Sequence, residues 1–295
     1  MNEISSNEKE LSANQQRILI IGVSGLIGRL LFNHLTKTYP TKYEVLGLDQ
    51  HMNISPRYQF KNYDNFKAET IVPLPLNKFF QCDITDREKL HQIIKEQNIK
   101  IIIHLAALLE THPDIEQISY VNIEGTKNVF EAPDIHRIIY ASSGMVVHGY
   151  LDRQPYLSIF NETFDDNTIL KDLRKITVAD DPPLPDLTTP GRTVYSKGKI
   201  ICEQMATDIV KNNSKSIICA RFGAVNIEDK PETTWNRSLW LSHRDLCSFI
   251  SKALEAPLNI SGIYFVMSNN HRLWVDLEHT KRDLGYVPQD GAEKI

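Results

Sequence analysis

The chain has few of the features that mark membrane, secreted or nucleic-acid-binding proteins. Its 295 residues include no run of about 18 consecutive apolar residues, so no segment is long enough to span a membrane. Residues 1–16 are polar and lack the apolar centre of a signal peptide, and we expect them to form a disordered leader. The net charge of -4 gives no reason to expect a nucleic-acid partner.

Cysteine is also scarce, and its positions follow no pattern. Cys82, Cys202, Cys219 and Cys247 are scattered, with no C-x-x-C pair. This spacing argues against a disulfide framework and against metal ligation, and it indicates reduced, mostly buried thiols in a cytoplasmic protein. An apolar content of 41% and a charged content of 24% are typical of a soluble globular protein, and we predict no metal.

The most informative feature that is present is a glycine motif directly after an apolar run. Residues 18–21 read Ile-Leu-Ile-Ile, and residues 22–28 read Gly-Val-Ser-Gly-Leu-Ile-Gly. Gly22 permits a sharp turn, Gly25 lets the backbone approach a pyrophosphate, and Gly28 lets the following helix pack close to a sheet. Amide groups at the start of that helix would face the phosphates, so the motif predicts a dinucleotide site.

A second signal lies about 20 residues further on, where the next predicted strand ends in Asp49. A carboxylate at this position accepts hydrogen bonds from a ribose 2′-hydroxyl and repels a 2′-phosphate, which favours NAD over NADP. Arg57 is close enough in the sequence to leave NADP open. Alternatively, Asp49 is only a turn residue at the end of a strand.

Predicted strands and helices alternate along the chain. The strands are expected at 18–21, 45–49, 79–83, 99–105, 137–143 and 216–222, and the helices at 26–35, 86–97, 118–130 and 195–212. Residues 99–105 are apolar on both faces, as a buried parallel strand requires. This alternation predicts an α/β fold with a doubly wound parallel sheet.

Two segments interrupt the alternation. Residues 50–78 contain three prolines and several aromatic residues, and we expect an irregular insertion there. Residues 150–192 are long and irregular; they form either a loop or lid over the substrate or a surface insertion without ligand contact. The resulting domain prediction is a nucleotide-binding domain over 17–223 and a small C-terminal substrate lobe over 224–295.

Candidate chemistry is concentrated in a Tyr-Ser-Lys-Gly-Lys segment. Tyr195 and Lys199 are four residues apart, so a helix places them one turn apart on one face. An ammonium group beside the ring, together with a cationic nicotinamide, favours the phenolate, which can then remove a hydroxyl proton as hydride leaves for the cofactor. Lys197 is a rival for the lysine role, but it lies on another face of the helix.

Small hydroxyl residues end the predicted strand 137–143. Side chains at the carboxyl end of such a strand face the crevice where ligands bind, and a serine there can hold the reacting oxygen against Tyr195. A strand-ending turn is the alternative. Counting from the strand selects Ser143, whereas counting back from His148-Gly149 selects Gly144; a one-residue insertion reconciles the two counts, and we choose Ser143.

These motifs, with Asp83, Asn122 and the strand end at 105–107, occur in the order seen in extended short-chain dehydrogenases. Over residues 17–290 the chain resembles the NAD-dependent epimerase/dehydratase family. The resemblance implies a Rossmann-type fold and a catalytic triad of Ser143, Tyr195 and Lys199. The implied NAD contacts are Gly22, Ser24, Gly25, Leu26, Ile27, Gly28, Asp49, Asp83, Ile84, Leu105, Ala106, Ala107, Asn122, Ser142, Tyr195, Lys199, Phe222 and Gly223.

Within this family, a few residues indicate the reaction. The 4,6-dehydratases carry an Asp-Glu pair directly after the catalytic serine or threonine, where this chain has Gly144 and Met145, so we reject a dehydratase. Nucleotide-sugar epimerases usually carry a larger C-terminal lobe. The segments around residues 239–246 and 285–293 instead resemble uronate dehydrogenases, which oxidise a free sugar acid with NAD. Ser242 and Asp245 in the first of these segments are equally well explained as the start of a helix.

The predicted substrate positions depart from the uronate pattern. By that resemblance they are Leu109, Gly144, Met145, Ala224, Trp235 and Arg237. The arginine that would hold a substrate carboxylate aligns with Trp235, and Arg237 is displaced from it by two positions, which matters because bidentate Arg–carboxylate contacts are geometrically demanding. The substrate therefore stays open among small sugars, sugar acids, polyols and more apolar alcohols.

Two further alternatives to a dehydrogenase remain: an epimerase that returns hydride to its substrate, and a non-catalytic NAD sensor. The resemblance also implies a homodimer through the helices at 118–130 and 195–212. Ile201, Met205 and Ile209 form an apolar stripe that fits such a contact, although the same stripe can face the protein's own sheet.

Overall fold

The structure is a computed structural model that describes residues 15–53, 74–161, 163, 173–212, 215–231 and 234–293, with only the backbone described for 234–236. Residues 1–14 of the expected leader and 54–73 of the expected insertion, including Arg57, lie outside the described residues. Residue 16 already belongs to the first strand, so the expected leader is one residue too long.

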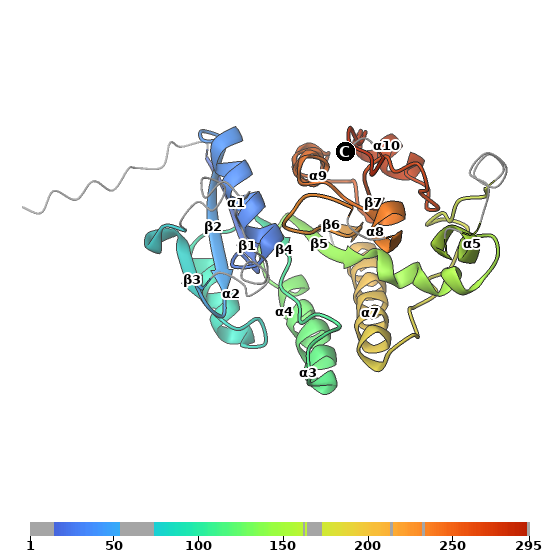
Figure 1. The fold of residues 1–295 in the computed structure, drawn as a ribbon. Helices are drawn as coiled ribbons and strands as arrows, with labels where there is room; N and C mark the ends of the chain where they lie inside the picture. The colour runs from blue at the N-terminus through green and yellow to red at the C-terminus, as the bar shows by residue number, and fades with distance from the viewer. Residues whose placement is uncertain are drawn as a thin grey trace, which may run out of the picture.

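Seven parallel strands form one sheet in the order β3-β2-β1-β4-β5-β6-β7 (Figure 1). They are β1 (Gln16–Ile21), β2 (Tyr43–Asp49), β3 (Phe79–Gln81), β4 (Ile101–His104), β5 (Arg137–Ser143), β6 (Ser216–Phe222) and β7 (Gly262–Val266). The predicted Rossmann-type α/β fold is confirmed. All six predicted strands are present, and β7 is an additional strand that the sequence analysis did not predict.

The strand order reverses at β1, which pairs with β2 on one side and with β4 on the other. In sheets of this kind, ligands bind outside the carboxyl ends of the strands at the point of reversal. The glycine motif follows β1 and the strand end at 105–107 follows β4, so both lie at this point. The Ser-Ser pair ends β5 two strands away from β1.

Helices cover both faces of the sheet. The described α-helices are α1 (Leu26–Thr38), α2 (Arg87–Glu96), α3 (Ile115–Tyr120), α4 (Thr126–Phe130), α5 (Tyr156–Asn161), α7 (Pro190–Asn212), α8 (Thr234–Leu239), α9 (His243–Glu255) and α10 (Glu278–Leu284); the 3-10 helices η3 (Leu76–Lys78) and η5 (Gly144–Asp152) and the π-helical turn η4 (Val121–Gly125) are also present. Buried side chains of α1 and α9 form one core with the sheet, and those of α2, α4 and α7 form a second core on the other face.

Local signals in the sequence explain where several helices begin. The Asp86 carboxylate accepts a hydrogen bond from the Lys89 amide and caps α2. Ser242 caps α9 in the same way by accepting a bond from the Asp245 amide at 3.0 Å, so its helix-start reading is confirmed. The helix predicted over 118–130 is instead α3 and α4 joined by η4, one turn of π-helix.

A third buried cluster joins the segment after β5 to the C-terminal part of the chain. Tyr156 of α5 packs against Trp274, and Ile176 pairs with Val275 in an isolated parallel bridge. Parts of the described segment within 150–192 are therefore ordered and packed, namely α5, the bridge at Ile176 and the start of α7 at Pro190. The expectation of an irregular segment over this whole range is wrong at these places.

Residues 224–293 contribute directly to the sheet, since they contain β7 and the α9 helix that packs beside α1. The expected C-terminal lobe thus shares its core with the nucleotide-binding part. Among the described helices, none combines the length and the apolar character that crossing a membrane requires.

Candidate active site

The glycine motif forms a tight cradle between β1 and α1. Gly22 has a φ of +90°, and a Cβ there would lie 2.6 Å from the Ala106 amide nitrogen. A Cβ on Gly28 would lie 2.3 Å from the Gly22 carbonyl oxygen. At Gly25, by contrast, the nearest such contact is 3.4 Å away, so the backbone is open on its outer side. Gly22 therefore makes the turn, Gly28 permits the close packing of α1, and Gly25 leaves its backbone open to a ligand. A pyrophosphate site requires these three features.

The start of α1 suits an anion. Gly25 precedes the helix without a side-chain cap, and the first turn carries no acidic residue. The positive end of the helix dipole therefore faces the space beside Gly25, where the phosphates of a dinucleotide would bind. This arrangement fits NAD.

A hollow of about 170 Å³ extends from the cradle toward β2. Asp49 lies in it, and its carboxylate accepts hydrogen bonds from the amides of Ser24 at 2.9 Å and Gln50 at 2.8 Å. Burial raises the pKa of the Asp49 carboxyl, and the two amide donors oppose that rise. Ile84 and Ala106 line the same hollow, whose shape and acid suit an adenosine ribose.

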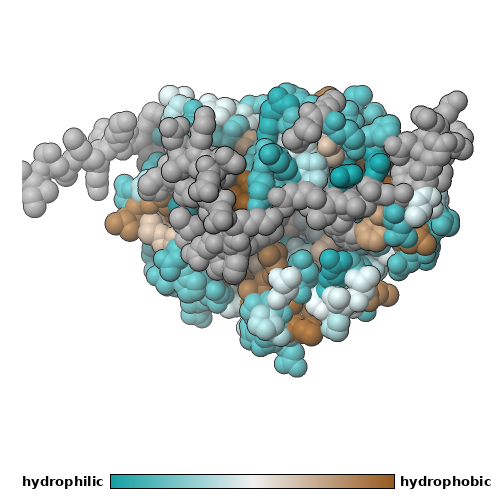
Figure 2. Space-filling view, viewed as in Figure 1, coloured by the Kyte–Doolittle hydropathy of each residue, from teal (hydrophilic) through white to brown (hydrophobic). Residues whose placement is uncertain are grey.

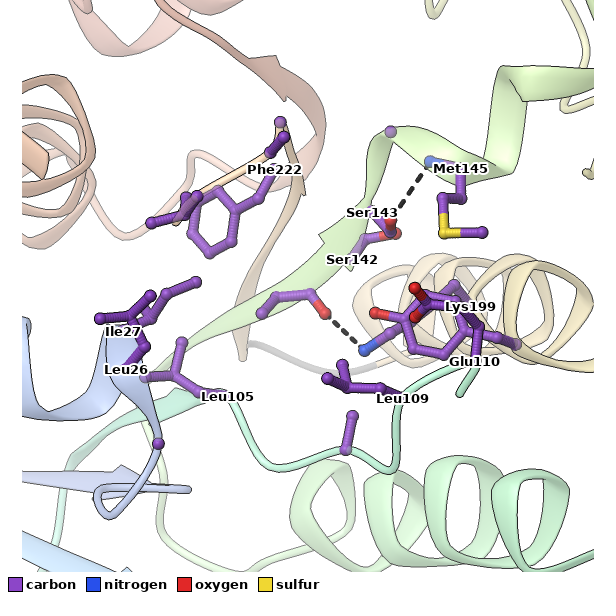
Figure 3. A pocket seen from close by; sticks show the side chains of 18 of the residues that line it. Leu26, Ile27, Leu105, Leu109, Glu110, Ser142, Ser143, Met145, Lys199 and Phe222 are labelled. Atoms are coloured by element: carbon purple, nitrogen blue, oxygen red, sulfur yellow. Dashed lines mark hydrogen bonds between the residues drawn. The ribbon is translucent and has the colours of Figure 1, made fainter. Parts of the chain in front are cut away.

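A larger cleft of about 450 Å³ opens on the other side of the cradle (Figure 3). Side chains from α1, the loop after β4, β5 and α7 converge on it. Its lining comprises Gly22, Gly25, Leu26, Ile27, Gly28, Leu105, Ala107, Leu109, Glu110, Ala141, Ser142, Ser143, Gly144, Met145, His148, Tyr195, Lys199, Phe222, Gly223, Ala224, Val225, Asn226 and Leu239. The structure thus brings Ser143, Tyr195 and Lys199 to one cleft from distant parts of the sequence.

Lys199 is fixed in the floor of this cleft. It is 2% exposed, and its Nζ donates a 2.7 Å hydrogen bond to the Ala141 carbonyl oxygen. The Nζ lies 5.5 Å from the centre of the Tyr195 ring and 4.8 Å from that of Tyr140. Burial lowers the pKa of Lys199 to about 8, although the Glu203 carboxylate opposes this. The helical spacing of the Tyr-x-x-x-Lys motif therefore produces a cation beside a phenol.

The two serines at the end of β5 point to different partners. The Ser143 hydroxyl accepts a hydrogen bond of 3.2 Å from the Met145 amide and lies at the cleft (Figure 3). The Ser142 hydroxyl donates to Glu203 at 2.6 Å, inside a buried network that includes the Glu203–Arg221 ion pair. This geometry favours Ser143 as the serine that meets a substrate oxygen.

Three predicted cofactor residues hold loops around the site without lining either hollow. The Asn122 side chain donates to the Leu108 carbonyl and accepts from the Leu108 amide, both at 2.8 Å. Asp83 accepts bonds from the Thr85 amide and hydroxyl at 2.8 Å. The Ser24 hydroxyl donates to a backbone carbonyl of the next loop, at His51.

Four of the predicted substrate residues, Leu109, Gly144, Met145 and Ala224, line the cleft. Arg237 does not line it; this residue is exposed on α8. The Trp235 side chain lies outside the described residues. Among the described residues, no arginine lines the cleft, and no group of three histidine, cysteine, aspartate or glutamate side chains is placed to hold a metal ion.

Three polar residues of the cleft were not predicted from the sequence: Glu110, His148 and Asn226. Glu110 lies in the loop after β4, and Asn226 lies in the loop after β6, so their positions beyond strand ends were an available signal. His148 lies one turn into η5, a helix that no local pattern predicted.

The cradle and the Ser-Tyr-Lys group at the carboxyl edge of a doubly wound sheet define an NAD-dependent enzyme. Residues 18–239 match the family described as NAD dependent epimerase/dehydratase. The chain belongs to this family.

Two relatives of this chain are named as dehydrogenases. The uronate dehydrogenase of Pseudomonas syringae pv. tomato is 26% identical over 215 residues, which cover 72% of this chain and 66%, slightly under two thirds, of that enzyme. The L-arabinose 1-dehydrogenase (NAD(P)(+)) of Haloferax volcanii is 27% identical over 229 residues, which cover 72% of this chain and 82% of that enzyme. The crystal structure of uronate dehydrogenase from Agrobacterium tumefaciens superimposes with a TM-score of 0.69 at 24% identity, over 95% of this chain and 87% of that one.

Proposed function

We propose that the protein is an NAD-dependent dehydrogenase that oxidises a hydroxyl-bearing carbon of a small, free sugar or polyol. The observation that carries the proposal is the convergence of Ser143, Tyr195 and Lys199 on a cleft that begins at the glycine cradle. The enzymatic nature of the relatives supports the same class of reaction.

In this mechanism, Tyr195 is the general base that takes the proton of the substrate hydroxyl. Ser143 holds the reacting oxygen by a hydrogen bond, and the Lys199 ammonium stabilises the tyrosinate. NAD supplies a hydride acceptor when it is bound. Lys199 keeps its position because its Nζ is tied to the backbone of β5.

The charge of the cleft favours a neutral substrate over a sugar acid. Glu110 contributes a carboxylate to the lining, and no arginine among the described residues faces it. The Lys199 cation is already bonded to Ala141. A substrate carboxylate would meet repulsion from Glu110 without a bidentate partner, whereas the hydroxyls of an aldose or polyol can donate to Glu110.

The test is NADH formation, followed by absorbance, with a panel of aldoses, polyols, free uronates and simple secondary alcohols. We expect the highest kcat/KM with a neutral sugar or polyol, and loss of at least about 100-fold in Tyr195→Phe, which keeps the ring and removes the base. NAD binding measured by calorimetry is the control and should persist in the variant. Cofactor retained through purification without net NADH release would instead support an epimerase, and NAD binding without turnover would support a sensor.

We also propose a homodimer built on α3 and α7. Tyr120 and Ile201 are 53% and 47% exposed, and hydrophobic residues appear among hydrophilic ones on the part of the surface where these helices lie (Figure 2). Met205 and Ile209 pack partly on the core of their own chain. Ile201 is therefore the residue of this apolar stripe whose substitution best tests the dimer contact. Ile201→Glu should convert a dimer to a monomer in light scattering, whereas a wild-type monomer would exclude this interface.

A cytoplasmic location is the remaining part of the proposal. The four cysteines are unpaired thiols, three of them buried, as expected in a reducing compartment.

A further inference from the structure

The Lys199 ammonium has two aromatic rings as neighbours. Its Nζ lies over the Tyr140 ring, 4.8 Å from the ring centre, and 5.5 Å from the centre of the Tyr195 ring. Tyr195 is the proposed base, one turn away on the same helix. Tyr140 is on β5, three residues before Ser143; it is fully buried, and the proposed mechanism gives it no part. The Tyr140 ring is therefore a close neighbour of the cation from a different element of the fold.

Neighbouring rings hold Tyr140 in this orientation. Phe130 packs against it in a T-shaped arrangement, with ring centres 5.2 Å apart and an angle of 84° between the planes. The His104 ring lies 5.5 Å away at 34°. His104 is itself anchored by a 3.0 Å hydrogen bond with the Thr126 hydroxyl. Since Tyr140 is 0% exposed in this closely packed core, its side chain cannot turn away from Lys199 without disturbing these contacts.

The hydrogen-bonding groups around Lys199 balance its charge only in part. The Nζ donates a 2.7 Å hydrogen bond to the Ala141 carbonyl oxygen (Figure 3). Glu203, one turn further along α7, directs its carboxylate to Ser142 and Arg221 instead, at 2.6 to 2.9 Å. Removal of an ammonium from water is costly unless other groups compensate for the lost hydration. The face of an aromatic ring carries negative electrostatic potential and supplies such compensation, most strongly where water is excluded.

Lys199 keeps its charge in competition with burial. Burial lowers its pKa to about 8, which the Cys202, Glu203 and Cys219 side chains oppose. Burial also raises the pKa of the Tyr140 phenol well above its ordinary value, so this ring stays neutral beside the cation. An aromatic face favours the charged form of Lys199 and therefore acts in the same direction as the carboxylate. The titratable groups around the ammonium are Tyr195, Cys202 and Glu203 of α7, Tyr140 of β5, His104 of β4 and Cys219 of β6.

We infer that Tyr140 is a positioning residue of the active site, whose ring face holds the Lys199 ammonium beside Tyr195 through a cation–π interaction. This role rests on the proposed function, since it keeps Lys199 placed for stabilising the tyrosinate. The interaction requires an electron-rich ring face and a protonated lysine, and it does not require the phenol hydroxyl of Tyr140. These requirements separate it from packing alone, which depends on shape and not on the charge of Lys199.

The experiment compares Tyr140→Phe with a variant that carries a phenylalanine trifluorinated on the ring at the same position. The two rings have closely similar shapes, but fluorine withdraws electron density from the ring face and weakens cation–π attraction. Urea unfolding is followed at a series of pH values. Tyr140→Phe should retain the wild-type pH dependence. The unfolding midpoint of the fluorinated variant, taken relative to Tyr140→Phe, should fall as the pH decreases through about 8, because Lys199 then becomes charged in the folded protein.

The same fluorinated residue at Phe249 is the matched control, because this buried ring contacts the rings of Phe222 and Tyr286. Its unfolding midpoint relative to wild type should be the same at every pH. A relative midpoint at Tyr140 that is likewise independent of pH would show that the ring acts by packing alone, and it would overturn the inference.

Turnover gives the second readout. With the best sugar of the panel, the alkaline limb of kcat/KM should shift to lower pH by roughly half a pH unit or more in the fluorinated Tyr140 variant, and it should stay in place in Tyr140→Phe. A limb that does not move, beside a pH-dependent unfolding midpoint, would show a contact without a role in the active site and would overturn the inference. Absence of NADH formation from every compound of the panel would overturn the proposed function, while the unfolding experiment would still decide the contact between the ring and Lys199.

Discussion

The Lys199 ammonium donates its 2.7 Å hydrogen bond to the carbonyl of Ala141, two residues before Ser143 on β5. Since Lys199 is one turn from Tyr195 on α7, this bond ties the helix that carries the base to the strand that carries the serine. This buried contact between the sheet and a helix on its face therefore helps to fix the relative positions of the three candidate catalytic side chains.

Lys199 should make the free energy of unfolding depend on pH, and its removal should abolish that dependence. The pKa of Lys199 falls from 10.5 to about 8 on burial in the folded protein. Between these values the unfolded chain binds a proton that the folded protein lacks, so the free energy of unfolding rises as the pH increases from about 8 to about 10.5. Below pH 8 the folded protein bears the cost of burying the charge, which is on the order of 3 kcal/mol.

Lys199→Met should remove this rise, which urea unfolding at a series of pH values will measure as the difference from wild type. Lys197→Met is the matched control, because Lys197 is exposed on another face of the same helix. A wild-type pH dependence that survives in Lys199→Met would show that another group is responsible. The same variant should lose at least about 100-fold in kcat.

The sequence was most informative where structure is local. The apolar run before Gly22, the acid at the end of β2 and the Tyr-x-x-x-Lys spacing each obey a rule that operates within a single turn, strand or helix. The dinucleotide cradle and the Tyr–Lys pair could therefore be predicted from them, and the alternation of strands and helices predicted the doubly wound sheet. The edge strand β7 is short, and only its last three residues are buried. Among the described strands it pairs with β6 alone, and a five-residue segment of this kind is hard to recognise from the sequence.

Other features depend on contacts between distant segments. His148 and Asp186 meet only because the described part of the segment after β5 folds back against the C-terminal cluster around Trp274. The Ser142–Glu203–Arg221 network likewise joins β5, α7 and β6. No periodicity or spacing links such residues in advance. Counting along the sequence could select Ser143 over Gly144, but it could not assign the buried Glu203 partner of Ser142.

Asp49 should control the choice of dinucleotide. Asp49→Asn removes the carboxylate that disfavours a 2′-phosphate, so the ratio of kcat/KM for NADP to that for NAD should rise by roughly tenfold or more. Asp134→Asn removes an equal charge from an exposed residue with a φ of 58° and is the control. Initial rates with both cofactors give the ratio, and an unchanged ratio in Asp49→Asn would remove this residue from cofactor selection.

Glu110 should discriminate between neutral sugars and sugar acids. Glu110→Gln replaces the carboxylate of the cleft by a neutral amide of the same shape, and the kcat/KM for uronates should rise several-fold relative to that for neutral sugars. The gain should shrink at high ionic strength, because added salt screens the repulsion in the wild-type protein. Glu116→Gln, an exposed change on α3, is the control. A uronate preference already present in the wild type would contradict the proposed neutral substrate.

The buried Glu203–Arg221 ion pair should affect both stability and the alkaline limit of activity. Both side chains are 2% exposed and 2.7 Å apart, so Glu203→Gln leaves a buried guanidinium without its carboxylate and should cost about 3–5 kcal/mol of unfolding free energy. The exposed Glu124, 3.9 Å from Lys127, is the control, since Glu124→Gln should cost under about 1 kcal/mol.

The same variant connects this network to Lys199. The Glu203 carboxylate raises the pKa of Lys199 against the effect of burial, so Glu203→Gln should move that pKa further below about 8. If the Lys199 ammonium is the group that must stay charged for turnover, the alkaline limb of kcat/KM will shift to lower pH, and Glu124→Gln will leave it in place. A limb that stays at the wild-type pH in Glu203→Gln, in a protein that is still folded by circular dichroism, would assign the alkaline limit to a group other than Lys199.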